Sequence, residues 1–341
     1  MMIKRRQHSD LSPRGAGGGR PGVVLSAAER GELQQALLAM LDDVVGVCGR
    51  HGIRCFLVGG TALGAIRHRG FIPWDDDADI AVFRRDHARL LAALGEERPA
   101  RYEVQSPERT AHYPSLITRI RLRGTEAMSR EDLWTDHGGV ALDVFVIENV
   151  FDSAVLRLTQ GAMSIFFTGL LACRKSFAIR RKMAGYRIPA AGYAVKSALR
   201  CIVGGAFAWL PVGFFRRAAL FFNRWCRNET SRFVSIPSGR LLFFNDMYRR
   251  EIFAEARSVD FAGRRFSLPA RAEEYLEHCY GDWRKIPENT ADGTHFLCRF
   301  SIGGWRKSFA ADGVVPGGCT GAGTESPLHP LGRTADDGRK L

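Results

Sequence analysis

Four aspartates gather in the segment FIPWDDDADIAVF, at Asp75, Asp76, Asp77 and Asp79. In an extended strand every second side chain shares a face, so Asp75, Asp77 and Asp79 should point one way and Asp76 the other. Three carboxylates on one face repel one another unless a cation lies among them. Carboxylate oxygens suit magnesium or manganese, so the segment predicts a divalent metal site. A solvated acidic turn that begins at Pro73 is the alternative.

A glycine pair precedes the acidic segment. Gly59 and Gly60 directly follow IRCFLV, a short apolar run typical of a buried strand, and Thr61 begins a short helical pattern. Glycines at this position let the backbone approach a phosphate closely, and the first N–H groups of the following helix favour an anion. Together with an acidic metal strand, the pair predicts a phosphate-binding loop.

A further acidic position is Asp143 in ALDVFVIE, within an apolar run that alternates like a strand. A buried carboxylate without a partner is costly, so Asp143 needs an arginine or a metal ion. The metal is favoured, because two-metal phosphoryl transfer uses carboxylates from neighbouring strands. Asp143 can also accept the proton of an attacking hydroxyl.

The hydrophobic pattern predicts the elements that must position these groups. A capping box of Ser26 and Glu29 begins an amphipathic helix, and a second helix is expected at RRDHARLLAALG. Strands are expected at IRCFLV, at RYEVQ and at residues 115–123 and 139–147. The alternation predicts an α/β (α+β) fold with a mixed sheet and flanking helices.

Residues 151–232 are helical in pattern, apolar and rich in arginine, and Pro211 interrupts the second apolar run. The uncharged runs reach about 15 residues, whereas a membrane span needs roughly 20. Buried helices of a helical subdomain are therefore expected first. Because arginines flank both runs, helices that rest on an anionic membrane surface remain the alternative.

Composition narrows the partners and the compartment. Lys and Arg number 49 against 36 Asp and Glu, a net charge of +13, which favours phosphate-rich, anionic-lipid or polyanionic partners. Nucleic acid is not expected, because no basic segment interleaved with aromatics resembles an RNA-binding signature. The eight cysteines occur singly, and the N-terminus lacks an apolar signal region, so a cytoplasmic protein with reduced thiols is expected.

The quoted segments resemble the motifs of the LicD family, which includes phosphocholine and fukutin-type ribitol-phosphate transferases of the nucleotidyltransferase fold. FLVGGTALGAIRHRGFIPWDDDADIAVFRRD resembles the first signature, ITRIRLRGT the next basic strand, and ALDVFVIE the third acidic motif. EIFAEARSVDFAGRRFSLPARAEEYLEHCYGDWRKIP resembles the C-terminal signature. The resemblance covers about residues 53–287 and is weakest over 151–240. Departures at Val146, Glu148 and Ala262 leave the acidic positions unchanged.

The resemblance implies roles for individual residues. Asp77 and Asp79 match the pair that holds magnesium, Asp143 matches the third carboxylate, and all three are implied as catalytic. Asp75 can complete or orient the metal ligands. Arg121 can hold a phosphate in two hydrogen bonds, with an ion pair to one of the aspartates as an equal alternative. The implied nucleotide-binding residues are Gly59, Gly60, Thr61, Arg67 and Arg121.

The resemblance also implies a reaction. It is the metal-dependent transfer of a phospho-alcohol such as phosphocholine from a CDP-alcohol to a hydroxyl of a cell-surface glycan or its lipid-linked precursor. Nucleotidyl transfer to RNA or a small molecule, with release of pyrophosphate, uses the same three carboxylates and is the alternative. A non-catalytic binding protein at a membrane surface is a third possibility. The expected location is cytoplasmic, with peripheral binding to the inner face of the membrane.

Four regions follow from the pattern and the resemblance. They are a disordered basic leader over residues 1–25, a nucleotidyltransferase-like catalytic core over 26–150, a helical subdomain with the C-terminal family motif over 151–309, and a disordered tail over 310–341.

Overall fold

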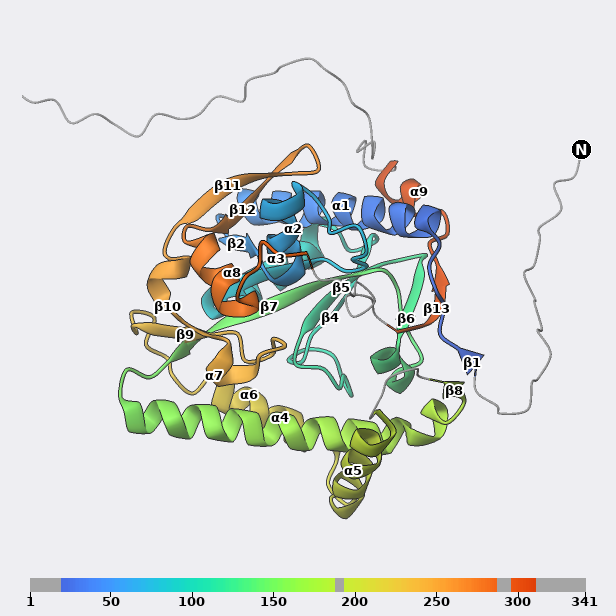
Figure 1. The fold of residues 1–341 in the computed structure, drawn as a ribbon, viewed down its shortest axis with the longest axis vertical. Helices are drawn as coiled ribbons and strands as arrows, with labels where there is room; N and C mark the ends of the chain where they lie inside the picture. Colours follow the sequence, from blue (N-terminus) through green and yellow to red (C-terminus); the bar gives the residue numbers. More distant parts are fainter. Residues whose placement is uncertain (1–19, 188–192, 287–295, 311–341) are drawn as a thin grey trace, which may run out of the picture.

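The computed structural model describes residues 20–187, 193–286 and 296–310. Its centre is a curled seven-stranded sheet with the order β10-β9-β7-β3-β2, to which β5 adds by pairing with β7 and β4 by pairing with β5 (Figure 1). The predicted mixed α/β fold is confirmed. The strands of this sheet are β2 (Cys55–Leu57), β3 (Asp79–Phe83), β4 (Tyr102–Gln105), β5 (Thr118–Leu122), β7 (Ala141–Val150), β9 (Phe233–Ser235) and β10 (Met247–Arg249).

The register of the central strands places charged residues side by side. β3 and β7 are parallel, with Asp79 beside Asp143, and β5 is antiparallel to β7, with Arg119 beside Asp143. Neighbouring strands lie about 4.8 Å apart, so side chains at paired positions project from the same face. Asp79, Asp143 and Arg119 therefore form one row across three strands.

Helices α1 (Ala27–Arg50), α2 (Gly59–His68) and α3 (Arg84–Glu97) lie together at the upper end of the sheet in Figure 1. The capping box that begins α1 is confirmed, because Ser26 Oγ accepts a hydrogen bond from the Glu29 N–H at 3.2 Å. The apolar face of α1 packs with the sheet and α3 in one continuous core. Its fully buried members include Leu37, Met40, Leu41, Phe56, Ile80 and Leu90.

Helices α4 (Ala154–Met183), α5 (Tyr193–Ala206) and α6 (Val212–Asn223) form a separate layer, with α4 along the lower end of the molecule and α5 projecting below it (Figure 1). The predicted helical character of this region is confirmed. By length and composition alone, α4 is able to cross a membrane. Of its most apolar stretch, 22% is buried inside the molecule. The expectation of buried helices is wrong for α5, whose apolar side chains face solvent.

The remaining elements bring the C-terminal third back to α2 and β2. Helix α8 (Ala272–Tyr280) packs against α2, and the hairpin of β11 (Ala256–Phe261) and β12 (Arg264–Pro269) packs against β2 and α2. The other elements are β1 (Arg20–Pro21), β6 (Glu126–Ser129), η1 (Arg130–Trp134), β8 (Tyr186–Arg187), α7 (Leu242–Asn245), η2 (Arg250–Phe253), β13 (Leu297–Ser301) and α9 (Trp305–Ala310).

Two predicted regions fall largely outside the described residues. These are residues 1–19 of the basic leader and residues 311–341 of the tail. Within the leader, Arg20–Pro21 forms β1, which pairs with β8, and Val23 forms a bridge with Leu297. The predicted boundaries between the four regions stay predictions.

Candidate active site

The acidic segment is a turn that leads into a strand. β3 begins only at Asp79, and the Asp75 N–H donates to the Ile72 carbonyl at 2.9 Å, which closes a turn. Gln34 of α1 also holds this turn, since its Nε2 donates to the carbonyls of Ile72 at 3.2 Å and Asp75 at 2.9 Å. The expectation that one continuous strand carries all the aspartates is therefore wrong.

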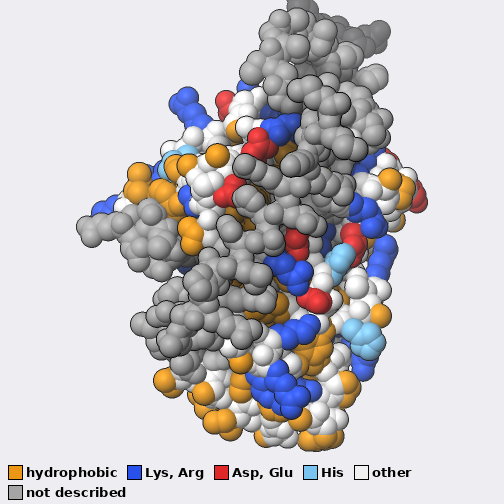
Figure 2. All heavy atoms as spheres, turned by 90° about the vertical axis from the view of Figure 1, so that its right-hand side faces the viewer, with side chains coloured by type: hydrophobic (Ala, Val, Ile, Leu, Met, Phe, Trp, Pro, Cys, Tyr) orange, Lys and Arg blue, Asp and Glu red, His pale blue; other side chains and the backbone are white. Residues whose placement is uncertain are grey.

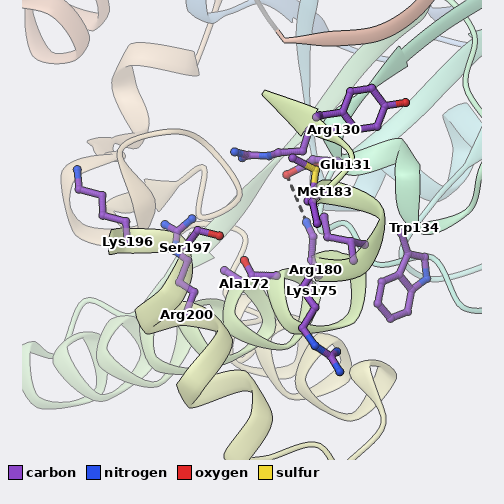
Figure 3. Close-up of a pocket in the computed structure, with 14 residues that line it drawn as sticks. Arg130, Glu131, Trp134, Ala172, Lys175, Arg180, Met183, Lys196, Ser197 and Arg200 are labelled. Carbon is purple, nitrogen blue, oxygen red and sulfur yellow. Dashed lines mark hydrogen bonds and ion pairs between the residues drawn. The ribbon is translucent and has the colours of Figure 1, made fainter. Parts of the chain in front are cut away.

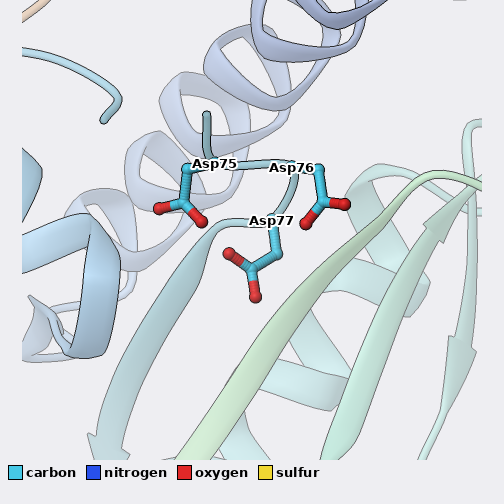
Figure 4. Close-up of side chains that lie close together, drawn as sticks. All are labelled: Asp75, Asp76 and Asp77. Carbon is cyan, nitrogen blue, oxygen red and sulfur yellow. The ribbon is translucent and has the colours of Figure 1, made fainter. Parts of the chain in front are cut away.

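The turn changes which carboxylates come together. Asp75, Asp76 and Asp77 each place an oxygen within 4.8 Å of the others, and Figure 4 shows the three side chains converging from one bend of the chain. The expectation that Asp76 points away is wrong, because the alternation of a strand does not apply before Asp79. Sequence reasoning missed Asp76 for this reason alone.

The glycine pair lies directly against these carboxylates. A Cβ atom on Gly59 would lie 2.7 Å from Asp79 Oδ2, and one on Gly60 would lie 2.9 Å from Asp75 Oδ2. Gly59 also has a φ of +56°, a conformation that side chains disfavour. Thr61 completes the contact, since its Oγ1 accepts from the Asp79 N–H at 2.8 Å. The loop and the carboxylates therefore lie in direct contact, and the backbone of Gly59 favours glycine. Their roles in binding phosphate and metal stay predictions.

Asp143 has an arginine partner. Arg119 Nε donates to Asp143 Oδ1 at 3.1 Å, and the same guanidinium lies 3.3 Å from Asp132 Oδ1 and 3.6 Å from Glu131 Oε2. Burial works against the charge on Arg119, but Asp143 and the other carboxylates raise its pKa well above the ordinary value. Arg119 is therefore a permanent cation that holds Asp143 in place.

Arg121 contacts other groups than the predicted ones. It is 3% exposed, and it donates to Gln105 Oε1 at 2.8 Å, to the Gly139 carbonyl at 3.0 Å and to Asp132. An ion pair does form, but with Asp132 instead of an aspartate of the predicted site. The structure thus connects Arg121 to Asp143 only indirectly, through Asp132 and Arg119.

Arg67 lies at the end of α2 and faces the C-terminal motif. Its Nη1 donates to the carbonyls of Trp283 at 3.0 Å and Lys285 at 3.1 Å. These bonds hold the segment after α8 beside the C-terminal end of α2. The contact of Arg67 with a nucleotide phosphate stays a prediction.

Two tyrosines of α8 reach the glycine loop and the carboxylates. Tyr275 Oη accepts a hydrogen bond from the Gly59 N–H at 2.9 Å. Burial raises the pKa of Tyr280, and Cys279, Asp79 and Asp75 raise it further, so its hydroxyl lies within the field of the acidic cluster. The Arg240 guanidinium lies 6.0 Å from the centre of the Tyr280 ring. Sequence reasoning included these tyrosines only in the C-terminal signature and missed Arg240, because no spacing relates residues so far apart to the loop.

A buried carboxylate, Asp246, is linked to α8 through Tyr248. Asp246 is 6% exposed and accepts a hydrogen bond from the Tyr248 hydroxyl, which also lies 3.1 Å from Cys279 Sγ. Burial raises the pKa of Asp246 to about 6, although Tyr248 and His278 work in the opposite direction. At neutral pH the fold therefore carries a buried negative charge beside the α8 tyrosines.

The wild-type protein should lose stability as the pH rises from about 4 to about 6, and Asp246→Asn should not show this loss. The native pKa of about 6 exceeds the ordinary 3.8, so this group stabilises the fold below about pH 4 and the contribution disappears as the pH rises through 6. The variant should gain up to about 3 kcal/mol relative to wild type between pH 4 and pH 7. Urea unfolding of both proteins across this range measures the difference.

His87 provides a control, because its contribution to stability changes with pH in the opposite direction from that of Asp246. It is buried against Thr118 Oγ1 at 2.9 Å, and burial lowers its pKa to about 4 from 6.5. Its stabilising contribution is present above about pH 6.5 and is lost as the pH falls towards 4. His87→Gln should therefore gain stability relative to wild type at the acidic end. A pH-independent difference for Asp246→Asn would contradict the assigned charge.

The donor set fits a divalent cation beside a phosphate. Asp75, Asp76 and Asp77 offer oxygen atoms alone, which magnesium and manganese prefer, and Asp79 and Asp143 add carboxylates from adjacent strands. The first turn of α2 adjoins them and offers backbone N–H groups to an anion. Carboxylates and backbone N–H groups suited to an anion thus meet at one point of the sheet, an arrangement that is able to serve phosphoryl transfer.

Comparison with known proteins agrees with this chemistry. A profile of the family described as LicD/FKTN/FKRP, nucleotidyltransferase domain, matches residues 52–115. The lipopolysaccharide cholinephosphotransferase LicD of Haemophilus influenzae is 33% identical over 274 residues, which are 78% of this chain and 95% of that protein. The ribitol 5-phosphate transferase FKRP of human is 49% identical over 63 residues, 18% of this chain and 13% of that protein.

The matched relatives thus include one that this chain covers almost completely. The glycine loop and the acidic turn fall within the 52–115 match, and a similarity along 95% of the Haemophilus protein extends well beyond that stretch. The chain belongs to the LicD family of phosphotransferases.

Proposed function

We propose that the protein transfers a phospho-alcohol of the phosphocholine or ribitol-phosphate kind from a CDP-alcohol to a hydroxyl of a cell-surface glycan or of its lipid-linked precursor. The contact of Gly59 with Asp79 and of Gly60 with Asp75 carries this proposal, because it joins a phosphate-binding loop to metal-binding carboxylates. The names of two relatives, a lipopolysaccharide cholinephosphotransferase and a ribitol 5-phosphate transferase, support the substrate class.

The acidic residues would hold magnesium or manganese, which would neutralise the diphosphate of the donor. The ligands we assign are Asp75, Asp77, Asp79 and Asp143, with Asp76 added because its carboxylate lies in the same group.

The glycine loop would fix the donor. Gly60 and Thr61 lie in the first turn of α2, where N–H groups have no acceptor within the helix, so these groups are suited to the diphosphate oxygens. The Gly59 N–H is different, since it donates to Tyr275. Tyr275 would therefore hold the loop in position, and the Gly59 N–H would not contact the donor.

Asp143 would act on the acceptor. Its Oδ1 is bonded to Arg119, whereas its Oδ2 accepts no hydrogen bond from the residues that the structure describes. Oδ2 is suited to take the proton of the acceptor hydroxyl. The hydroxyl oxygen then bonds to the phosphorus that carries the alcohol, the bond from that phosphorus to the bridging oxygen breaks, and cytidine monophosphate leaves in line.

Calorimetric titration with CDP-choline, CDP-ribitol, CTP and ATP, each with and without magnesium, tests the proposal. We expect selective binding of one CDP-alcohol that depends on magnesium, and loss of that dependence in Asp77→Asn. A preference for a plain triphosphate, followed by pyrophosphate release in an assay, would instead support nucleotidyl transfer. Absence of nucleotide binding under all conditions would overturn the assignment of the donor.

A further inference from the structure

Large apolar side chains are exposed at the lower end of the molecule, where α4, α5 and α6 lie. Figure 2 shows hydrophobic side chains across this end, with a group of Lys and Arg side chains directly above them. On α5, Val195, Leu199 and Ile202 are 74%, 62% and 70% exposed, and Trp209 after α5 is 76% exposed. Phe221 of α6 is 60% exposed. Exposed apolar groups gathered in this way mark an interaction surface.

The orientation of α5 follows from its glycines. A Cβ on Gly204 would lie 2.2 Å from the Cys173 carbonyl oxygen of α4, and one on Gly205 would lie 3.1 Å from the Phe177 ring. Gly204 is therefore pressed against α4. At about 100° per residue, Val195, Leu199 and Ile202 lie roughly 140–180° around the helix from Gly204. The packing of the two helices thus leaves the apolar stripe exposed.

A basic pocket of about 410 Å³ lies beside this stripe, between η1, the end of α4 and the start of α5 (Figure 3). Its single acidic side chain, Glu131, forms an ion pair with Lys175 at 3.3 Å, and Lys175 and Arg119 lower its pKa to about 2 despite its burial. Glu131 is thus fully ionised and already paired. The cations that line the pocket are Arg130, Lys175, Arg180, Lys196 and Arg200.

Two of the pocket cations are on α5. Lys196 and Arg200, four residues apart, form no ion pair with any residue that the structure describes. They lie roughly 90° and 130° around α5 from the centre of the apolar stripe. Ser197, between them, also lines the pocket and adds a hydroxyl. The pocket therefore suits a phosphate group, which accepts several charge-assisted hydrogen bonds.

The order of the two surfaces fits a helix layer that lies on a membrane. Apolar side chains form the tip, and cations follow directly above them, at the level that lipid headgroups would take. A spanning α4 fits less well, because its polar side chains are bonded inside the protein. Gln160 Nε2 donates to the Asn149 carbonyl at 3.0 Å, and Ser164 Oγ donates to Asn223 Oδ1 at 2.6 Å.

We propose that α4, α5 and α6 dock the protein on the surface of an anionic membrane, where the basic pocket takes the phosphate of a lipid headgroup. The apolar stripe of α5 enters the interface, and Lys196 and Arg200 contact the headgroup. The proposal does not depend on the transfer reaction. It gives a structural basis for the peripheral location that the sequence predicts.

Sedimentation with vesicles tests the proposal on the full chain. We expect binding to vesicles of phosphatidylcholine mixed with phosphatidylglycerol, weakened by salt, and little binding to phosphatidylcholine alone. The double variant Lys196→Gln, Arg200→Gln should bind the mixed vesicles roughly 30-fold more weakly. Leu199→Gln with Ile202→Gln should weaken binding while leaving its salt dependence in place.

The matched control is Arg265→Gln with Lys307→Gln. Both residues are exposed, and β12 and α9, which carry them, lie at the opposite end of the molecule. The control removes the same charge, so an equal loss of binding would show that net charge alone is responsible and would overturn the proposal. Failure of wild type to bind mixed vesicles would overturn it as well. So would a dimer in lipid-free sedimentation that Leu199→Gln with Ile202→Gln dissociates, since a second copy would then cover the stripe.

Discussion

Replacing Asp79 with asparagine should lower kcat roughly a thousandfold or more and leave the protein folded. Asp79 begins β3 beside Asp143, and its Oδ2 lies against the backbone of Gly59. An amide keeps the shape of the side chain but cannot supply the negative charge that a divalent cation requires. Asp77→Asn should have the same consequence. Turnover of the CDP-alcohol identified by titration measures the loss.

Stability should change in the opposite direction from activity. Removing one negative charge from a crowded acidic cluster relieves repulsion, so the midpoint of thermal unfolding of Asp79→Asn should equal or exceed that of wild type. Asp136→Asn is the matched control, because Asp136 is exposed and pairs with Arg299 at 3.0 Å on another part of the surface. It should keep full activity. If Asp79→Asn keeps most of its turnover, the assignment of the metal ligands is wrong.

Replacing Arg119 with methionine should lower the free energy of unfolding by about 3–5 kcal/mol. The guanidinium contacts Asp143, Asp132 and Glu131, and methionine would leave these carboxylates in a region of low dielectric without their shared cation. Turnover should fall too, because Asp143 would lose the bond that orients it. Urea unfolding at neutral pH measures the loss of stability.

A neighbouring arginine provides the control. Arg123 belongs to the same segment as Arg119, ITRIRLRG. Its side chain is 52% exposed and lies 4.0 Å from Glu103, so Arg123→Met should change the free energy of unfolding by less than about 1 kcal/mol. Equal losses for Arg119→Met and Arg123→Met would show that the contacts of Arg119 with its three carboxylates do not stabilise the fold.

Local patterns were sufficient for most of the elements. The Ser26 capping box begins α1 as predicted, and the apolar run before Gly59 forms β2. The helix expected directly after the glycine pair is also present, as α2. In each case neighbouring residues in the chain determine the structure.

The errors have a common physical origin in contacts between distant residues. Gln34 of α1 helps hold residues 72–75 in a turn, and nothing in the acidic segment itself indicates this. ITRIRLRG offers arginines at alternating positions, but only the pairing of β5 with β7 decides that Arg119, and not Arg121, lies beside Asp143. The exposure of α5 likewise depends on how Gly204 meets α4.

The bond between Gly59 and Tyr275 has a consequence for protein synthesis. It joins residues 216 positions apart, and Arg67 meets Trp283 across the same separation. At a translation rate of about 5–20 residues per second, roughly 10–40 s separate the emergence of the loop from that of its partners. A nascent chain therefore exposes the acidic turn well before α8 completes it. An interrupted translation product would lack the bond of Tyr275 to Gly59, so under the proposed function only chains that include α8 would complete the donor site.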